Sequence, residues 1–389
     1  LLLALLFGAL LWYAPVAAVL TVAVFLPSIW IYYGLVRNRI NRYGELENKA
    51  QREKARLVAE TFRGYADLEI AGAYPAMLSD FDRSMDEIIR VRQRNATRRY
   101  VDFVKETTDV RLDGLHVVLD CAQGASYEVA PMVFKELGAQ VSCYYHEPDG
   151  TNINDHCGST HPRRLCELVR ELGADVGFAF DGDADRLMAV DERGSLINGD
   201  QVMAMLAVYL KGQGRLRQNT IVATIMSNMG LDIAMKKHGI RVEKTKVGDR
   251  YVLEKMLADG FVLGGEQSGH VILLDHNTTG DGLVTAVQVI SAMVKAQRPL
   301  SRLSAVMQIM PQSQYAANVS DSRKYDFDKN EKIMDMIRQL EEKYKDKGRL
   351  VIRASGTEPR VRVMIEGPDQ REMDRDVYTL SKLIEKELN

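Results

Sequence analysis

The sequence lacks a strong net charge, paired cysteines and low-complexity tracts. Its 389 residues carry 51 Lys and Arg against 53 Asp and Glu, which leaves a formal net charge of −2. No overall basic field is therefore available to attract nucleic acid. The four cysteines, Cys121, Cys143, Cys157 and Cys166, contain no C-x-x-C pair. We expect a reduced, cytosolic setting for the part of the chain that carries them.

Charged residues are also absent from the first 36 positions. A transmembrane helix needs about 20 apolar residues, and residues 16–36 are long enough to cross a bilayer. Three arginines follow at once, and by the positive-inside rule they place the downstream chain in the cytoplasm. We therefore expect membrane contact through residues 1–36. The alternative is a buried hairpin of a globular protein.

The next segment, residues 45–99, is charged and helical in period. A turn at residues 71–75 divides it, and a second helix is expected over about 77–94. This arrangement resembles the membrane domain of an ABC exporter, in which a late transmembrane helix continues as a long cytoplasmic extension. The chain has no GxxxxGK[ST] loop and no LSGGQ-like signature, so we expect no ATPase domain to accompany it.

Strand and helix patterns alternate after about residue 97, which is typical of a mostly parallel sheet. After a linker at 298–314, the last segment predicts a separate α+β domain. We therefore predict an α/β protein: two α/β domains and a C-terminal α+β domain, preceded by a helical, membrane-associated segment. The expected domains are 1–96, 97–195, 196–307 and 308–389. The expected strands are 115–120, 140–145, 175–180, 220–226, 241–245, 261–264, 349–353 and 360–366, and the expected helices are 126–137, 163–172, 201–210, 230–238, 249–258, 282–295, 329–345 and 370–388.

Three aspartates alternate along the turn that follows the apolar run at 176–180: Asp181, Asp183 and Asp185. Carboxylates so close together repel one another unless a cation lies between them. Hard oxygen ligands of this kind suit Mg²⁺, which commonly shares a substrate phosphate, and Arg186 adds a fixed cation for that phosphate. The alternatives are a solvated acidic turn and an EF-hand loop. The EF-hand fails because Arg186 stands where that loop needs Gly.

A second polar loop, GGEQSGH at residues 264–270, joins two short apolar runs. Glu266, Ser268 and His270 offer an anion, a hydroxyl and a titratable ring at alternate positions, which suits the hydroxyls of a sugar. The alternative is a polar hairpin turn.

Two further loops are rich in cations. In RASGTEPR at residues 353–360, Arg353 and the two hydroxyls around Gly356 could form a nest for a phosphate, although an ordinary hairpin connection is the alternative. In KTKVGDR at residues 244–250, lysines precede an expected helix and could present cations at its N-terminus, although a solvated turn is the alternative.

The order and wording of DGDADR, GGEQSGH and RASGTEPR resemble the α-D-phosphohexomutases over about residues 97–389. Gln267, together with KVGDRYV at residues 246–252, is most similar to the branch of this family that acts on glucosamine phosphate. The resemblance implies an enzyme that interconverts glucosamine 6-phosphate and glucosamine 1-phosphate through a bisphosphate. It also implies Mg²⁺ as cofactor and a phosphosugar as partner.

The resemblance further implies a role for each matching residue. The three aspartates would hold Mg²⁺, and Arg186 and Lys246 would line the site of phosphoryl transfer. The sugar-orienting residues would be Glu266, Ser268 and His270, with His270 also among the catalytic residues. The residues that would clamp the non-reacting phosphate are Arg353, Ser355, Gly356, Thr357 and Arg362.

The family's phosphoserine loop, of a Thr-Ala-Ser-His-Asn type, has no counterpart in the sequence, and Ser159 in GSTH is the nearest similar residue. We therefore expect the chain alone not to turn over, and we expect residues 1–96 to be fused to the remainder near Thr97. Two alternatives are a membrane-tethered phosphosugar-binding protein without catalysis and a transporter subunit that carries the remainder as a passenger. The oligomeric state stays open.

Overall fold

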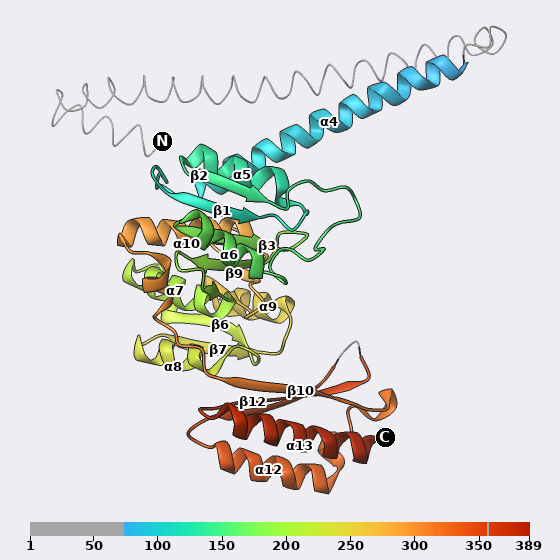
Figure 1. Cartoon of the computed structure of the whole chain (residues 1–389), viewed down its shortest axis with the longest axis vertical. Helices are drawn as coiled ribbons and strands as arrows, with labels where there is room; N and C mark the ends of the chain where they lie inside the picture. The colour runs from blue at the N-terminus through green and yellow to red at the C-terminus, as the bar shows by residue number, and fades with distance from the viewer. Residues whose placement is uncertain (1–73, 356–357) are drawn as a thin grey trace, which may run out of the picture. The chain divides into compact units, whose positions relative to one another are not determined.

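The computed structural model describes residues 74–355 and 358–389, and the chain divides into two compact units, residues 1–100 and 101–389 (Figure 1). The expected membrane segment at 1–36 lies outside the described residues, and so do the first three positions of the expected turn at 71–75. The turn is wrong at its last two positions, Tyr74 and Pro75, which belong to a helix. None of the helices in the described ranges combines the length and the apolar character needed to cross a bilayer.

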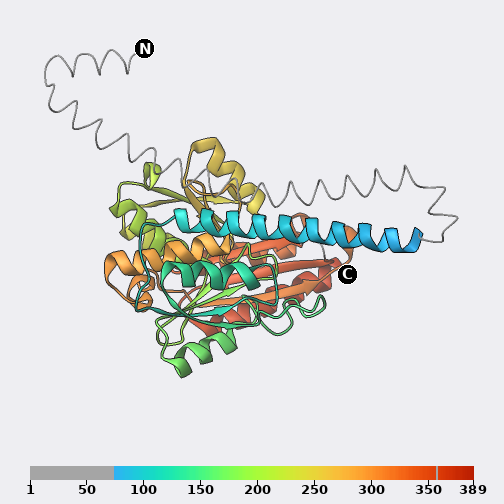
Figure 2. The same ribbon diagram turned by 90° about the horizontal axis from the view of Figure 1, so that it is seen from above.

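Helix α4, Tyr74–Glu106, is the first described element, and Figure 2 shows it as one uninterrupted helix over that length. The helix expected at 77–94 is thus confirmed in type but is longer at its C-terminal end. It stops at Thr107, whose hydroxyl donates a hydrogen bond back to the carbonyl of Val104 over 2.7 Å. No loop marks the expected junction near Thr97, because that position lies inside the helix.

The first sheet has the strand order β2-β1-β3-β4-β5. The pairs β1–β2 and β1–β3 are parallel, whereas β3–β4 and β4–β5 are antiparallel. Helices α5 and α6 cover opposite faces, since Phe178 stacks on Phe134 of α5 while its neighbour Ala179 joins the core formed with α6. The bounds are β1 His116–Asp120, α5 Ser126–Leu137, β2 Gln140–Tyr144, α6 Arg163–Leu172, β3 Val176–Phe180, β4 Leu187–Asp191 and β5 Leu196–Ile197.

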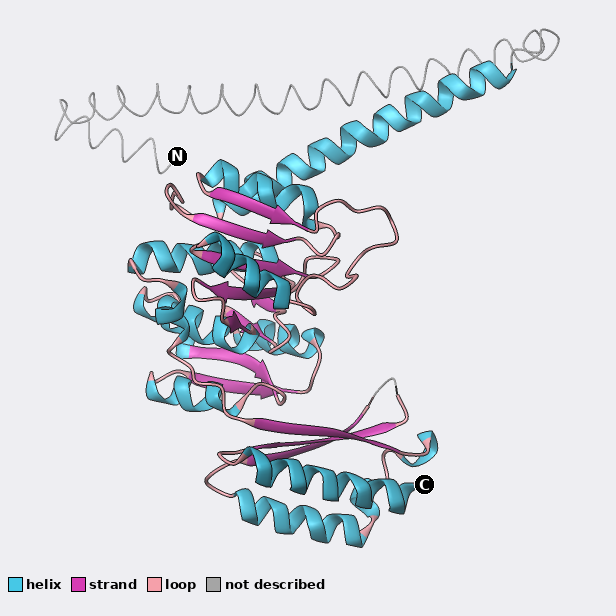
Figure 3. Ribbon diagram, viewed as in Figure 1, coloured by secondary structure: helices cyan, strands magenta, loops and turns pink. Residues whose placement is uncertain are grey.

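The second sheet has the order β7-β6-β8-β9, with β9 antiparallel to β8. Its strands lie among helices (Figure 3). Helix α10 is buried at every position from Gly282 to Met293, because it contacts strands of both sheets, β4 and β9. The bounds are α7 Gly199–Gly212, η1 Arg217–Asn219, β6 Thr220–Thr224, α8 Met229–Lys237, β7 Arg241–Thr245, α9 Asp249–Asp259, β8 Leu263–Gly265, β9 Val271–Leu273, α10 Gly282–Ala296 and α11 Leu300–Ser304.

The third sheet is antiparallel, in the order β10-β12-β11. Alternate residues of β12, Val361, Val363 and Ile365, face a core that helices α12 and α13 complete. The linker expected at 298–314 is wrong in part, since it contains α11 and the start of β10. The bounds are β10 Gln312–Asn318, η2 Asp321–Arg323, η3 Phe327–Lys329, α12 Glu331–Tyr344, β11 Arg349–Ala354, β12 Arg360–Glu366 and α13 Gln370–Leu388.

A buried carboxylate ties this third sheet to the turn before α8. Glu366 is fully buried and accepts hydrogen bonds from Asn228 Nδ2 at 3.0 Å and from the backbone N–H of Met229 at 3.1 Å. It also pairs with Arg349, which in turn donates to the carbonyl of Ser227. Buried charge is tolerated here because each group has hydrogen-bonding partners.

The ring of Phe178 carries much of the packing between α5 and the first sheet. We expect Phe178→Ala to lower the free energy of unfolding by about 3–5 kcal/mol, because it removes a fully buried ring and leaves a cavity against Phe134. Chemical denaturation of the full chain measures this change. The matched control is Leu196→Ala on β5, which is 41% exposed and should cost less than about 1 kcal/mol. Equal losses in the two variants would contradict this packing.

Candidate functional site

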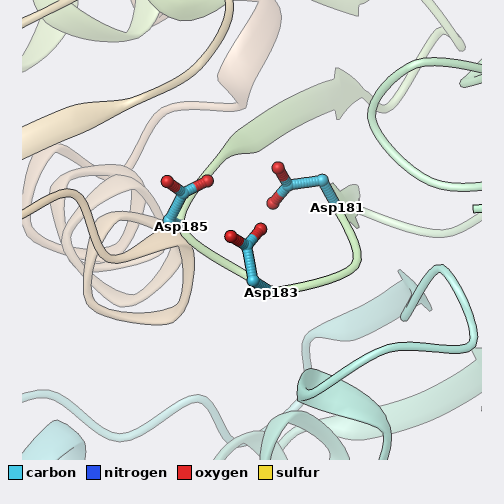
Figure 4. A group of neighbouring side chains, drawn as sticks. All are labelled: Asp181, Asp183 and Asp185. Carbon is cyan, nitrogen blue, oxygen red and sulfur yellow. The ribbon is translucent and has the colours of Figure 1, made fainter. Parts of the chain in front are cut away.

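The three alternating aspartates lie on the turn between β3 and β4, directly after the last residue of a fully buried strand. Asp181, Asp183 and Asp185 turn their carboxylates toward one point, and one oxygen of each lies within 4.8 Å of the others (Figure 4). Ligands bind at the carboxyl ends of strands in open α/β sheets, and this turn occupies that position relative to β1 and β3.

Backbone contacts fix the shape of this turn. Ala184 adopts a left-handed conformation with φ of 62°, and its N–H donates to the carbonyl of Asp181 at 3.1 Å. The carbonyl of Gly182 accepts a hydrogen bond from the N–H of Ala125 at 2.8 Å. Gly124 packs so closely on the turn that an added Cβ would lie 2.2 Å from that same carbonyl oxygen. The β1–α5 connection therefore packs against the aspartate turn and supports its backbone.

The electrostatics of the turn favour a bound cation. Burial, together with the negative charges of Asp185 and Asp183, raises the pKa of Asp181 to about 6. Arg186 only partly offsets this charge, since its Nε lies 3.6 Å from Asp181 and 3.7 Å from Asp185. Asp185 Oδ1 is buried and accepts no hydrogen bond from the described residues. These hard oxygen donors, one of them without a hydrogen bond, fit a magnesium ion.

His270 lies against this turn with both ring nitrogens engaged. Its Nε2 accepts a hydrogen bond from the backbone N–H of Gly280 at 3.1 Å, which places the proton of a neutral ring on Nδ1. Nδ1 lies 3.1 Å from Asp185 Oδ2 and donates to it. The ring is 3% exposed, and an added Cβ on Gly280 would lie 2.5 Å from it. His270 therefore contacts the aspartate turn directly.

The GGEQSGH loop is a tight turn between β8 and β9. Its ends are closed by a hydrogen bond from the N–H of Glu266 to the carbonyl of His270 at 2.9 Å. The Glu266 carboxylate accepts from the backbone N–H of Gly248 at 3.1 Å, which joins this loop to the lysine-containing loop before α9. Ser268 Oγ is buried and has no hydrogen-bonding partner among the described residues. A free hydroxyl here is suited to bind a polar ligand group.

The two lysines of the KTKVGDR loop differ in their surroundings. Lys246 is exposed, so its ammonium group is available to an anionic ligand. Lys244 instead pairs with Asp232 at 3.1 Å. Lys244 is thus paired within the protein, whereas the role of Lys246 as a cation at the site stays a prediction.

The strands β11 and β12, which flank the RASGTEPR loop, place two arginines opposite each other in the sheet register, Arg353 and Arg362. Burial and the positive charge of Arg362 lower the pKa of Arg353, whose Nε is buried without a hydrogen-bonding partner among the described residues. Arg362 pairs with Glu358 at 3.2 Å, and Ser355 Oγ accepts from the N–H of Glu358. Two adjacent guanidinium groups favour an anion. Gly356 and Thr357 lie outside the described residues.

The structure therefore brings the predicted residues together in pairs: Asp185 with His270, and the Lys246 loop with Glu266. The negative charge of Glu266 acts to raise the pKa of Arg353, against the effects of burial and of Arg362. The GGEQSGH loop and the arginine pair therefore interact electrostatically. Reasoning from sequence missed the supporting residues Gly124 and Gly280. Their role depends on contacts between distant segments, which no local pattern reveals.

Ser159, the residue most similar to the family's phosphoserine loop, is 6% exposed. Its backbone N–H donates to the carbonyl of Phe180 at 2.7 Å, immediately before the aspartate turn. This backbone hydrogen bond places Ser159 next to the aspartate turn.

Three parts of the chain match known family descriptions. Residues 98–194 match "Phosphoglucomutase/phosphomannomutase, alpha/beta/alpha domain II", residues 198–310 match the corresponding domain III, and residues 316–376 match the C-terminal domain. The comparisons do not show the resemblance of residues 1–96 to an exporter membrane domain, which stays a prediction.

Similar proteins point the same way. The chain is 55% identical over 297 residues to the phosphoglucosamine mutase of Ruminiclostridium cellulolyticum (76% of this chain, 66% of the relative) and 54% identical over 289 residues to that of Acetivibrio thermocellus (74% and 64%). It spans just under two thirds of the length of these relatives. A crystal structure of Aspergillus fumigatus N-acetylphosphoglucosamine mutase with GlcNAc-6P and magnesium shares the fold, with a TM-score of 0.62 at 17% identity, covering 76% of this chain and 66% of that one.

One buried carboxyl group behind the site predicts a pH effect on stability. Asp120 accepts hydrogen bonds from the N–H groups of Ala122 at 3.0 Å and Gly158 at 2.9 Å, and burial raises its pKa to about 6. The unfolded chain binds this proton only below a pKa of about 3.9, so this group makes the free energy of unfolding fall as pH rises from about 4 to 6.

We expect the difference in free energy of unfolding, wild type minus Asp120→Asn, to decrease over this pH range by an amount on the order of 3 kcal/mol. Denaturant titrations at several pH values measure it. Asp113→Asn is the control, because Arg111 lowers the pKa of that exposed group and its small effect should have the opposite sign. A wild-type advantage that is constant or rises with pH would contradict the assignment.

Proposed function

Because the chain belongs to the phosphoglucomutase/phosphomannomutase family, we propose that residues 97–389 bind glucosamine phosphate and Mg²⁺ for the interconversion of glucosamine 6-phosphate and glucosamine 1-phosphate through a bisphosphate. The identity to phosphoglucosamine mutases supports the choice of sugar. Within this range we propose three domains, at 97–195, 196–307 and 308–389. The first and the last would each contribute one loop to the site, and the middle one would contribute two.

The observation that carries the proposal is the convergence of the three carboxylates, with one buried oxygen, Asp185 Oδ1, that accepts no hydrogen bond from the described residues. We propose Asp181, Asp183 and Asp185 as the ligands of Mg²⁺. When bound, the ion supplies positive charge that polarises a phosphoryl oxygen. Without a cation, the three side chains hold a cluster of negative charge that would repel a phosphosugar.

The remaining side chains would act on the ligand itself. Arg186 precedes β4 and Lys246 follows the carboxyl end of β7. We assign both cations to stabilise the negative charge that spreads over a phosphoryl group during transfer. Glu266 and Ser268 would accept and donate hydrogen bonds to sugar hydroxyls. The paired guanidinium groups of β11 and β12 would bind the phosphate that does not react, together with the adjacent serine and glycine loop. The residues assigned to this last role are Arg353, Ser355, Gly356, Thr357 and Arg362.

His270 takes a different part in this arrangement from the sugar contact that the sequence suggests. Both of its ring nitrogens are engaged, with Asp185 and with the backbone of Gly280. We therefore assign it to hold the Asp185 carboxylate in the orientation that a metal ligand needs, as histidines and carboxylates beside metal ligands commonly do.

A phosphoryl group must also be supplied to the sugar. The family carries it on a serine in a loop that has no counterpart in the printed sequence. Binding of the phosphosugar is therefore the property by which the described loops are best tested, and turnover is read separately. Neither the fusion near Thr97 nor the transporter alternative gains support from the family matches, which cover residues 98–376 in three parts.

The proposal predicts that Asp183→Ala abolishes magnesium-dependent sugar binding. Calorimetric titration of the full chain with glucosamine 6-phosphate should give binding that requires Mg²⁺. We expect Asp183→Ala to weaken this binding more than about 100-fold. Mutation of a residue that only orients a metal ligand already lowers metal affinity by about 10–100-fold, and loss of the ligand itself should cost more. The control Asp155→Ala removes another exposed carboxylate, outside the metal cluster, and should leave binding unchanged.

Turnover is measured in parallel, with a trace of glucosamine 1,6-bisphosphate as primer. Binding without turnover would support the assigned loops and would favour a phosphosugar-binding role for this chain alone. Binding equally strong in Asp183→Ala, or independent of Mg²⁺, would overturn the metal site.

A further inference from the structure

Two cysteines lie side by side behind the aspartate turn. Cys121 Sγ and Cys143 Sγ are 3.6 Å apart, and both thiols are free. Cys143 lies on β2 and Cys121 directly follows the adjacent parallel strand β1. In the β1–β2 register, Cys143 stands opposite Leu119, which precedes Cys121 by two positions. A disulfide needs a sulfur–sulfur distance of about 2.05 Å, so the thiols are within about 1.5 Å of bonding.

The position of Cys121 connects this pair to the metal site. Cys121 begins the turn between β1 and α5, and its carbonyl accepts a hydrogen bond from the N–H of Gly124 at 2.8 Å. Ala125 then donates to the carbonyl of Gly182, between the first two aspartates. Gly124 packs on that same carbonyl with no room for a methyl group. Two backbone hydrogen bonds and one close backbone contact therefore connect Cys121 to the aspartate turn.

The turn itself is already constrained. Ala122 and Gln123 both adopt left-handed backbone conformations, with φ of 53° at each. This conformation costs free energy in non-glycine residues, so the turn persists only because the surrounding contacts stabilise it. Cys121 contributes to that hold through its N–H, which donates to the carbonyl of Tyr144 at 3.1 Å.

We propose that Cys121 and Cys143 form a reversible disulfide whose closure shifts the β1–α5 turn and lowers the affinity of the aspartate turn for its divalent cation. The formation of the bond stands on the cysteine geometry alone. Its effect on the cation rests on the proposed function.

The chemistry balances with a peroxide as oxidant. The sulfur of Cys143 attacks one oxygen of hydrogen peroxide, an S–O bond forms, the O–O bond breaks and water leaves, which gives a sulfenic acid. The sulfur of Cys121 then attacks this sulfur, an S–S bond forms, the S–O bond breaks and a second water leaves. Two electrons pass from the thiols to the peroxide. A dithiol reverses the bond by exchange.

The surroundings of the two thiols suit these roles. Cys143 is half-buried on the edge strand β2, so an oxidant can reach it, whereas Cys121 is fully buried. The thiol of Cys121 and the charge of Lys135 lower the pKa of Cys143. Contact with Cys143 and burial raise the pKa of Cys121, so we expect Cys143, the half-buried member of the pair, to react first.

The experiment treats the full chain with hydrogen peroxide and follows thiols and cation binding together. Thiol titration under denaturing conditions should fall from four to two, and peptide mass analysis should find residues 121 and 143 in one linked fragment. The dissociation constant for Mg²⁺ should rise about fivefold or more on oxidation, the lower range of a coupling between sites, and a dithiol should restore it.

The variants separate the parts of this inference. Cys143→Ala should keep the Mg²⁺ affinity of the reduced protein and lose its response to peroxide, while the control Cys166→Ser, a free cysteine on α6, should respond like the wild type. Four titratable thiols after oxidation, or a linkage through Cys157 or Cys166, would overturn the disulfide. A disulfide that leaves the affinity unchanged would overturn the coupling. Failure of the reduced chain to bind Mg²⁺ would instead overturn the proposed function.

Discussion

The mutual repulsion of three carboxylates at the end of β3 is the constraint on which the rest of the site depends. Asp181, Asp183 and Asp185 converge within 4.8 Å, and the one positive charge of the neighbouring Arg186 does not neutralise the three carboxylates. Burial and the neighbouring carboxylates raise the pKa of Asp181 to about 6. A bound divalent cation would reduce this repulsion and favour the ionised form of all three side chains. The fold tolerates the repulsion because the backbone of the turn is fixed from outside.

Close backbone packing provides that fixation. Gly124 lies against the carbonyl of Gly182, and Gly280 lies against the ring of His270, which holds Asp185. In both places a methyl group would displace either the turn or its support. The aspartates therefore belong to a unit that extends through the β1–α5 connection and the loop before α10. A change in the supporting backbone, such as a bond between Cys121 and Cys143, would therefore shift the positions of the carboxylates.

Local signals in the sequence predicted much of the fold. The helices at 126–137 and 163–172 have the predicted bounds because Gly138 and Gly173 end them in left-handed conformations. The α/β class and the order of strands and helices in the C-terminal α+β segment followed from alternation in the same way, whereas the antiparallel pairing of that segment's strands was not predicted. The aspartates could be predicted because one short turn carries all three. The partners of His270 could not, since Gly280 and Asp185 reach it from separate segments, and α11 was missed because a five-residue helix leaves too short a pattern.

The central claim is that the aspartate turn holds a divalent cation, and thermal unfolding of the full chain across a series of Mg²⁺ concentrations tests it most directly. A ligand bound only by the folded state stabilises it by about 2.7 kcal/mol at a hundred times its dissociation constant. We predict that the unfolding midpoint rises with Mg²⁺ in the wild type and stays constant in Asp185→Ala. A midpoint that does not move, or that rises equally in both proteins, would contradict the account.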